Sequence, residues 1–329
     1  MKRRNLLRTG AHLLCLTWFT PWYAHGTARR FHTAFVFDDR FLLPVFPAAH
    51  PEQPARVQAI LRALDNEGLL QQLHRIEPLR NVDGALALVH TQNHISAIRQ
   101  RYGAADDIAR TGVGAVLAAV RAVCGGDVIN AFSCSRPPGH HARNTGREEG
   151  FCFYNNIAIA ARYAQREFKL ERVLIVDWDY HHGDGTEAFF YDDPSVLYFS
   201  THDWHAYPGT GDPARQGAGA GLGYNINVPL PCGATDSDIV TAFESQLAPA
   251  AEEFKPELVL VSAGFDSRVD DLLGCFKVTD AGFVRLTEIV KGIAARHCQG
   301  RLVSMLEGGY NLGGLASAVT AHIRSLLFE

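Results

Sequence analysis

The sequence lacks the marks of several protein classes. It contains no Cys-x-x-Cys pair, which excludes a zinc knuckle built from cysteines. Its one apolar stretch of interest to a membrane, at residues 13–22, is too short to cross a bilayer, which excludes a multispanning membrane protein. It has no Walker lysine, and the glycine-rich run at 217–223 lacks the Gly-x-Gly-x-x-Gly order, so we expect no nucleotide site.

An excess of positive charge is also missing. The 329 residues carry 31 Lys and Arg against 35 Asp and Glu, for a net charge of −4. The first 26 residues hold four of the basic residues and no acid, which leaves 27 basic and 35 acidic residues, a net charge of −8, in the rest of the chain. This acidic body argues against nucleic acid as a partner and is compatible with cationic small molecules or lysine-rich peptides.

The seven cysteines are scattered, at positions 15, 124, 134, 152, 232, 275 and 298. In a chain of this length they do not indicate a disulfide framework. We expect most of them to be buried thiols.

Residues 1–26 have the composition of a targeting segment. Lys2, Arg3 and Arg4 precede the apolar stretch, and Ala24 and Gly26 supply small residues at a cleavage site. The run of residues 2–8 also resembles a twin-arginine export motif. We therefore expect an export signal at 1–26, a periplasmic location, and no stable membrane insertion after processing. An organelle transit peptide and an uncleaved anchor are the alternatives.

Short apolar runs alternate with helical patterns along the rest of the chain. The runs occupy residues 31–37, 128–134, 173–176, 196–200, 224–228, 258–262 and 302–306. The helical patterns occupy residues 53–64, 84–101, 112–123, 156–168, 236–253 and 280–297. Because no linker or internal repeat interrupts them after residue 30, they predict a single α/β domain with a mostly parallel central sheet flanked by helices.

Four polar clusters follow predicted strands, where parallel sheets bind their ligands; they occupy residues 136–141, 177–185, 262–266 and 307–310. Asp177, Asp179 and His181 alternate along the second cluster, so in extended backbone their side chains share one face. Because unpaired polar groups are costly to bury, we expect a cation there. Asp179, His181 and Asp266 form a candidate site with a fourth position left for water or substrate. We expect zinc, and ferrous iron also suits this oxygen-rich set.

The remaining polar residues supply what the hydrolysis of an amide needs. His140 and His141 offer two adjacent imidazoles, which can act as a base toward a metal-bound water. Asp177 and Asp184 are available to fix the tautomers of these imidazoles. Tyr310, in a Gly-Gly-Tyr turn, can donate its hydroxyl to a developing oxyanion. Metal, base and hydroxyl together predict hydrolysis of an amide carbonyl.

The four clusters together resemble the histone deacetylase family, which includes bacterial histone deacetylase-like proteins and acetylpolyamine amidohydrolases. The Arg-Pro-Pro lead into the histidine pair is similar to the class II branch. Further matching segments are residues 50–52, 150–152, 207–211 and 223–229. The resemblance covers about residues 31–329 in family order, and no core catalytic position departs from it.

The resemblance implies the arginase/deacetylase fold, with about eight strands, and a zinc-dependent deacetylase domain at residues 27–329. It implies that His141 acts as general base and then acid, with Asp184 as its partner. It makes His140, with Asp177 behind it, an electrostatic helper. Tyr310 would polarise the carbonyl together with zinc.

The resemblance also implies binding residues. Zinc would be held, one ion per chain, by Asp179, His181 and Asp266. A structural potassium would bind, partly through main-chain oxygens, at Asp177, Asp179, His181, Ser200 and Thr201. The substrate channel would be lined by Gly150, Phe151, Tyr207 and Leu273. Asp106 or Asp107 is a candidate for holding the substrate backbone, and Cys152 is expected near the channel, exposed to oxidation.

The resemblance implies removal of acetyl or other short acyl groups from acylated amines, such as acetyl-lysine or acetylpolyamines. One alternative is a catalytically silent binder of acylated ligands, which would be expected to lose Tyr310, a histidine or a metal ligand. Another is a binuclear manganese ureohydrolase on the same fold, which needs more carboxylate ligands than the sequence offers. An oligomer is compatible with the sequence.

Overall fold

The structure, a computed structural model, describes residues 31–328, so the predicted export signal at 1–26 lies outside the described residues. An eight-stranded sheet runs through the described part in the order β2-β1-β3-β8-β7-β4-β5-β6, and all neighbouring strands are parallel. The strands are β1 (Phe31–Val36), β2 (His74–Ile76), β3 (Val128–Ser133), β4 (Val173–Asp177), β5 (Val196–Asp203), β6 (Asn225–Leu230), β7 (Leu258–Ala263) and β8 (Leu302–Leu306). The predicted α/β fold and its sheet of about eight strands are confirmed.

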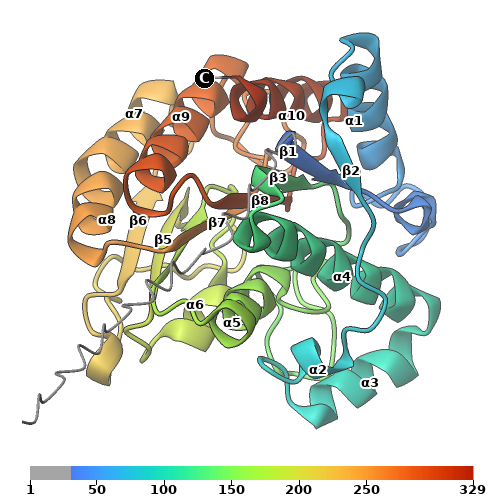
Figure 1. The fold of residues 1–329 in the computed structure, drawn as a ribbon, viewed down its shortest axis with the longest axis horizontal. Coiled ribbons are helices and arrows are strands. Elements are labelled where there is room, and N and C mark those ends of the chain that lie inside the picture. Colours follow the sequence, from blue (N-terminus) through green and yellow to red (C-terminus); the bar gives the residue numbers. More distant parts are fainter. Residues whose placement is uncertain (1–30, 329) are drawn as a thin grey trace, which may run out of the picture.

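Helices cover both faces of the sheet (Figure 1). The helices are α1 (Ala55–Asn66), α2 (Asp83–Leu86), α3 (Gln92–Tyr102), α4 (Ala104–Gly125), α5 (Asn156–Phe168), α6 (Asp184–Phe190), α7 (Asp236–Ala242), α8 (Ala248–Phe254), α9 (Asp280–His297) and α10 (Leu312–Leu327). On one face α4 packs on β1, β3 and β8, and α5 packs on β4 and β7. On the other face α10 packs on β1 and β3, and α9 packs on β7 and β8. Every residue of β4, β7 and β8 is therefore buried, which explains their continuous apolar sequences.

The structure differs from the predicted elements at a few places. The pattern at 84–101 is divided into α2 and α3, because Thr91 caps a new helix by accepting a hydrogen bond from the His94 backbone N–H. The pattern at 236–253 is one helical run with a π-turn at Phe243–Leu247 between α7 and α8. Three elements, β2, α6 and α10, are not among the predicted ones.

Among the described residues, one helix, α4, is long and apolar enough to cross a membrane. Most of its apolar window, 78%, is buried inside the fold. Its apolar residues therefore serve the core between the sheet and α5.

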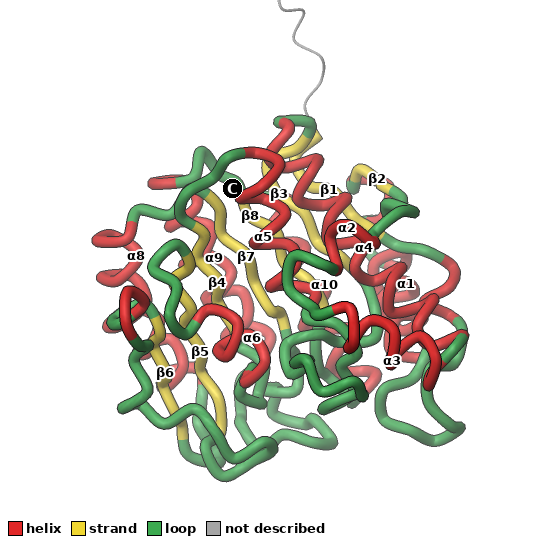
Figure 2. Tube along the Cα trace, turned by 90° about the horizontal axis from the view of Figure 1, so that it is seen from below, coloured by secondary structure: helices red, strands yellow, loops and turns green. Residues whose placement is uncertain are grey.

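The loops gather at one end of the sheet (Figure 2). Parallel strands all end at the same edge, so the residues that follow them are brought together there. This edge carries the candidate functional residues.

Candidate active site and metal centre

The four polar clusters follow four strands that are neighbours in the sheet, β3, β8, β7 and β4. The histidine pair follows β3, Tyr310 follows β8, Asp266 follows β7, and the segment 177–185 begins at the end of β4. Residues more than one hundred positions apart in the sequence thus meet at the centre of the sheet's carboxyl edge. Because the strands are rigid and buried, they hold these groups in fixed relative positions.

Asp179, His181 and Asp266 converge on one point, and their ligating atoms all lie within 4.8 Å of one another. Nδ1 of His181 lies 3.2 Å from Oδ1 of Asp179 and 3.0 Å from Oδ2 of Asp266. Ligand atoms around a tetrahedral ion with bonds of ~2.1 Å lie about 3.4 Å apart, so this spacing suits a metal ion. Two carboxylates and one imidazole are a donor set for a divalent cation.

Backbone amides hold the second oxygen of each carboxylate. The Gly308 N–H donates to Oδ2 of Asp179, and the Tyr180 N–H donates to Oδ1 of Asp266, both at 2.8 Å. A Cβ on Gly264 would overlap the carboxylate of Asp179. A Cβ on Gly308 would overlap that of Asp266. The glycines of the third and fourth clusters therefore make room for the two carboxylates.

The electrostatics of this point favour positive charge. Although burial opposes it, the Asp179 and Asp266 carboxylates raise the pKa of His181 to about 10. Burial, together with the charge of Asp179, raises the pKa of Asp266 to about 7. Two buried carboxylates this close repel each other unless a cation lies between them. The three residues thus meet both the geometric and the electrostatic requirement of a metal site.

Each imidazole of the histidine pair has its own carboxylate. Nδ1 of His140 lies 3.1 Å from Oδ2 of Asp177, and Nδ1 of His141 lies 2.9 Å from Oδ1 of Asp184. Because an ionised carboxylate only accepts hydrogen bonds, Nδ1 carries the hydrogen in both rings. The Nε2 atom of a neutral ring is then free to take a proton.

The two imidazoles differ in charge. Burial, with the neighbouring charge of His140, lowers the pKa of His141 to about 3. Burial opposes protonation of His140 as well, but Asp179 and Asp177 raise its pKa well above the usual value. In active sites, such a difference between two pKa values lets one group act as a base while its neighbour stays charged. The neutral member is His141.

Tyr310 is buried beside the pair. Its backbone N–H donates to Oδ2 of Asp271 at 2.6 Å, and the Arg56 guanidinium lies 4.9 Å from its ring centre. Burial raises the pKa of the Tyr310 hydroxyl well above 10, so the hydroxyl keeps its proton and remains a donor.

A cavity of about 600 Å³ joins these groups. Its lining includes His140, His141, His181 and Tyr310, together with the four predicted channel residues Gly150, Phe151, Tyr207 and Leu273. The Tyr207 side chain, half exposed, and Leu273 stand at its rim. The structure therefore brings the predicted catalytic, metal and channel residues to one place.

The family model of the histone deacetylase domain matches residues 50–326. The chain belongs to the histone deacetylase family. It is 38% identical over 312 residues to "Histone deacetylase 10, chloroplastic" from rice, which covers 85% of this chain and 70% of the relative. It is 35% identical to a "Probable deacetylase" from Archaeoglobus fulgidus, over 86% of this chain and 82% of the relative.

Two further comparisons agree with the family. The human "Polyamine deacetylase HDAC10" is 38% identical over 92% of this chain, and the chain spans about half, 48%, of that relative. The crystal structure of the HDA15 HD domain superposes with a TM-score of 0.85 at 37% identity, covering 90% of this chain and 89% of that one. The chain is therefore a deacetylase with the arginase/deacetylase fold.

In this deacetylase the residues predicted to bind potassium lie at the ends of two paired strands. Asp177 of β4 is the register partner of Ser200 of β5, and both are buried. The hydroxyl oxygen of the neighbouring Thr201 is buried without a hydrogen-bond partner in the described part of the chain.

Two expectations about single residues are wrong: the substrate-holding role of Asp106 or Asp107, and the exposure of Cys152 to oxidation. Asp106 is buried, and its carboxylate accepts hydrogen bonds from the Tyr154 hydroxyl and the Arg110 side chain. Asp107 lines a separate polar hollow. Cys152 does lie near the channel, within 4.8 Å of the cavity residue His140. It is fully buried, however, and burial raises the pKa of its thiol well above 9. This deacetylase therefore keeps Cys152 protected from oxidation.

Glu307, a buried carboxylate within the fourth cluster, was not among the predicted site residues. Its Oε2 accepts hydrogen bonds from the backbone N–H groups of Gly139, at 2.6 Å, and His140, at 3.3 Å. Its Oε1 accepts from the Ser262 hydroxyl at 3.0 Å. Glu307 therefore ties the loop of the histidine pair to β7 and β8. Its place in the Glu-Gly-Gly-Tyr segment was the only available signal.

A buried ion pair was also missed. Arg136 donates from Nε and Nη2 to the two oxygens of Glu52, each at 2.6 Å, across 84 positions in the sequence. Both residues stand in segments that carry the resemblance. The pair fixes the loop that leads into the histidine pair of the candidate site.

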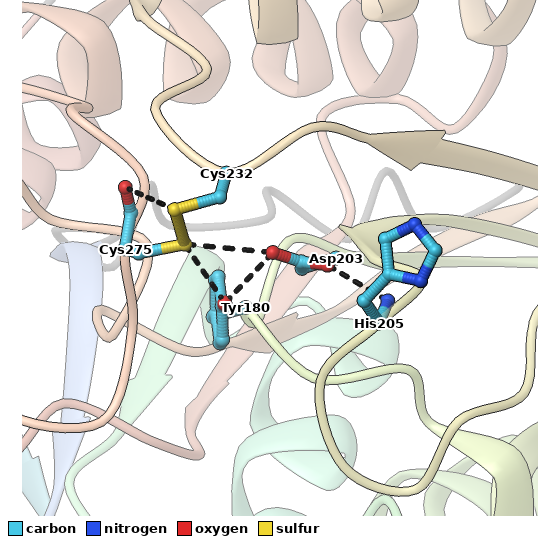
Figure 3. The surroundings of a disulfide bond; sticks show 5 residues. All are labelled: Tyr180, Asp203, His205, Cys232 and Cys275. Carbon is cyan, nitrogen blue, oxygen red and sulfur yellow. Dashed lines mark hydrogen bonds between the residues drawn. A yellow bond between two sulfur atoms is a disulfide. The ribbon is translucent and has the colours of Figure 1, made fainter.

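Cys232 and Cys275 form a disulfide next to Tyr180 and Asp203 (Figure 3). The Tyr180 hydroxyl donates to Oδ2 of Asp203 at 2.8 Å and lies 3.1 Å from the Cys275 sulfur. The disulfide joins the turn after β6 to the loop that carries the rim residue Leu273. The other four described cysteines are free, and three of them are buried. Half of the six described cysteines are thus the buried thiols that were expected of most.

Proposed function

We propose that this deacetylase is a zinc-dependent amidohydrolase that removes acetyl or other short acyl groups from acylated amines such as acetyl-lysine or acetylpolyamines. One observation carries the proposal. A two-carboxylate, one-imidazole cluster shares a cavity with a neutral, carboxylate-oriented imidazole and a protonated phenol. This combination provides the groups that metal-assisted amide hydrolysis requires.

Asp179, His181 and Asp266 would hold the zinc. The ion, when bound, would polarise the acyl carbonyl and lower the pKa of a water molecule. The donor set supports zinc because three protein ligands leave a position open for catalysis, and two carboxylates balance the charge of a divalent ion.

His141 would move the proton in this reaction. Its Nδ1–H is held by Asp184, so Nε2 is the atom that takes a proton from the attacking water. The same atom then returns the proton to the leaving amine, which departs with the free acid as the other product. His140, held charged by Asp177 and Asp179, would stabilise negative charge next to it.

Tyr310 would stabilise the oxyanion. Its hydroxyl stays protonated and lines the same cavity, so it can donate a hydrogen bond to the oxygen on which charge develops. Phe151 and Tyr207 would flank the acyl chain, and Leu273 would stand at the channel rim. The unpartnered hydroxyl of Thr201 beside Ser200 supports a structural potassium at the ends of β4 and β5.

The test is a substrate panel with the purified, zinc-loaded protein. The panel contains acetyl-, trifluoroacetyl- and longer acyl-lysine peptides, and acetylated putrescine, cadaverine and spermidine. We expect chelator-sensitive release of the acid and one zinc per chain by elemental analysis. Two manganese ions per chain would favour a ureohydrolase. No release from any member, with one zinc bound, would favour a silent binder of acylated ligands.

We further propose that residues 1–26 direct export and that residues 27–329 form the catalytic domain. The basic, acid-free composition of the segment supports this, as does the disulfide, because disulfides persist in oxidising compartments. The mass of the mature protein recovered from a bacterial periplasm tests it. A full-length chain retained in the cytoplasm would contradict export.

A further inference from the structure

The active-site cavity has an unbalanced charge at its lining. Glu148 is the only carboxylate of the lining within the described residues. No Lys or Arg side chain takes part in the lining. The cavity therefore presents a carboxylate and no fixed cation to the part of the substrate that leads out of the channel.

Glu148 is held in place by the wall of the channel. Its Oε1 accepts a hydrogen bond from the backbone N–H of Phe151 at 2.5 Å, and its own N–H donates to the Tyr102 hydroxyl at 3.1 Å. Phe151 has a left-handed backbone with φ of 70°, which the Glu148 carboxylate stabilises. Because the Phe151 N–H occupies Oε1, the second carboxylate oxygen, Oε2, is available to a ligand.

The neighbouring cationic side chains do not pair with the Glu148 carboxylate. In the described part of the chain no ion pair joins it to a cation, although Arg147 precedes it. Arg143 interacts instead with Glu149 at 2.5 Å and with Asp184 at 3.5 Å. The single charge of Arg143 is thus shared between two other carboxylates. Burial and these acids, Glu148 among them, raise the pKa of the nearby Tyr207 to about 12.

We propose that Glu148 is a specificity-determining residue that selects acylated amines with a second, cationic amine on their tail. This inference rests on the proposed amidohydrolase function and names its substrate class as N-acylated diamines and polyamines. An acylated diamine carries an ammonium where an acyl-lysine residue in a peptide carries its neutral backbone. A partly desolvated carboxylate attracts that ammonium, and the peptide offers it nothing equivalent.

The test compares two substrates that differ only in this group. N-acetylcadaverine ends in an ammonium, and 5-acetamidopentan-1-ol ends in a hydroxyl. We expect the wild-type holoenzyme to have the higher kcat/KM for N-acetylcadaverine. In Glu148→Gln the ratio of the two kcat/KM values should fall about tenfold, the size of one hydrogen bond to a charged group, and the change should appear in KM.

Glutamine is chosen so that an effect on substrate selectivity can be told apart from an effect on the structure of the channel. Its side-chain carbonyl can still accept the Phe151 N–H, so the wall of the channel is retained while the charge is lost. Glu253→Gln, on the exposed surface of α8, removes the same charge away from the cavity and should leave the ratio at the wild-type value. Glu148→Asp, which keeps the charge, should retain part of the preference. Raising the salt concentration should lower the wild-type ratio.

Different outcomes would contradict this inference and the proposed amidohydrolase function on which it rests. Release of acetate from neither substrate nor any panel member contradicts the proposed function. An active enzyme with equal kcat/KM for the two substrates contradicts the role of Glu148 alone. So does a Glu148→Gln variant in which both substrates slow by the same factor, because this would make Glu148 only a support for Phe151. If Glu148→Gln does not fold, a wild-type ratio that is unaffected by salt overturns the inference.

Discussion

Nδ1 of His141 lies 2.9 Å from Oδ1 of Asp184. This contact decides which nitrogen of the imidazole carries the hydrogen, because an ionised carboxylate accepts and never donates. Asp184 begins helix α6, directly after the segment that contributes two residues of the candidate metal site. A single stretch of chain therefore positions both the candidate metal ligands and the proposed base.

We expect Asp184→Asn to lower kcat by about 10²–10⁴, because an amide can donate to Nδ1 and reverse the tautomer of His141. The effect on KM and on metal content should be small. Steady-state kinetics with elemental analysis of the same preparation measures both. A kcat close to the wild-type value would remove Asp184 from the orientation of the base.

Tyr310→Phe should lower kcat by about 10²–10³, the cost of removing one oxyanion donor. The phenyl ring keeps the packing against Phe151, whose ring centre lies 5.9 Å away, so the fold should be retained. Kinetics and a thermal melt are the measurements. If turnover is unchanged while the melt is also unchanged, the hydroxyl has no part in catalysis.

Asp266→Asn should reduce the zinc content of the purified protein well below one ion per chain. The amide removes a negative charge and offers a weaker ligand at the point where Asp266 meets His181. Asp270→Asn is the matched control, because Asp270 lies on the same loop but is half exposed and pairs with Arg268. Equal zinc in both variants would show that Asp266 is not a ligand.

The fold and the central site are predictable because their signals are local. Apolar runs define the strands, and the polar clusters begin where those runs end. Four of these strands are neighbours in the sheet, so residues that were suspected separately meet. This adjacency could not be read from the sequence, since the strand order reflects crossovers and not chain order.

The missed features depend on contacts between distant segments. The Arg136–Glu52 pair and the three hydrogen bonds to Glu307 join residues that carry no sign of each other in the sequence. The error at Cys152 has a different cause. Phe151 lines the cavity, but its left-handed backbone turns the chain, and the next side chain enters the core.

The Cys232–Cys275 disulfide closes a loop across 43 positions. Such a loop stabilises a protein by about 2–4 kcal/mol in the chain-entropy description. We expect Cys232→Ser to lower the free energy of unfolding by about that amount, measured by urea denaturation without reductant. Cys124→Ser, which removes a free thiol, is the control.

The denatured, unreduced wild type should also show two fewer reactive thiols than the reduced protein. Equal thiol counts would contradict the disulfide.

His322 is a buried imidazole on α10, outside the active site. The Thr287 hydroxyl donates to the Phe283 carbonyl, so it must accept from Nδ1–H of His322, while the Ser304 hydroxyl lies 2.8 Å from Nε2 and donates to it. This network holds the ring neutral. Burial, with the charge of Lys291, lowers its pKa to about 3.

The sign of the pH effect follows from that shift. Between about pH 6.5 and 3 the unfolded chain binds a proton at His322 that the folded chain does not, so stability falls as the pH falls through this window. One such group contributes a slope of up to about 1.4 kcal/mol per pH unit. His322→Asn should therefore flatten the dependence of the unfolding free energy on pH between about 6 and 4, although the variant is less stable at pH 7. His205→Asn, at an exposed position, should keep the wild-type slope. Identical slopes for wild type and His322→Asn would mean that His322 accepts its proton in the folded protein as readily as in the unfolded chain.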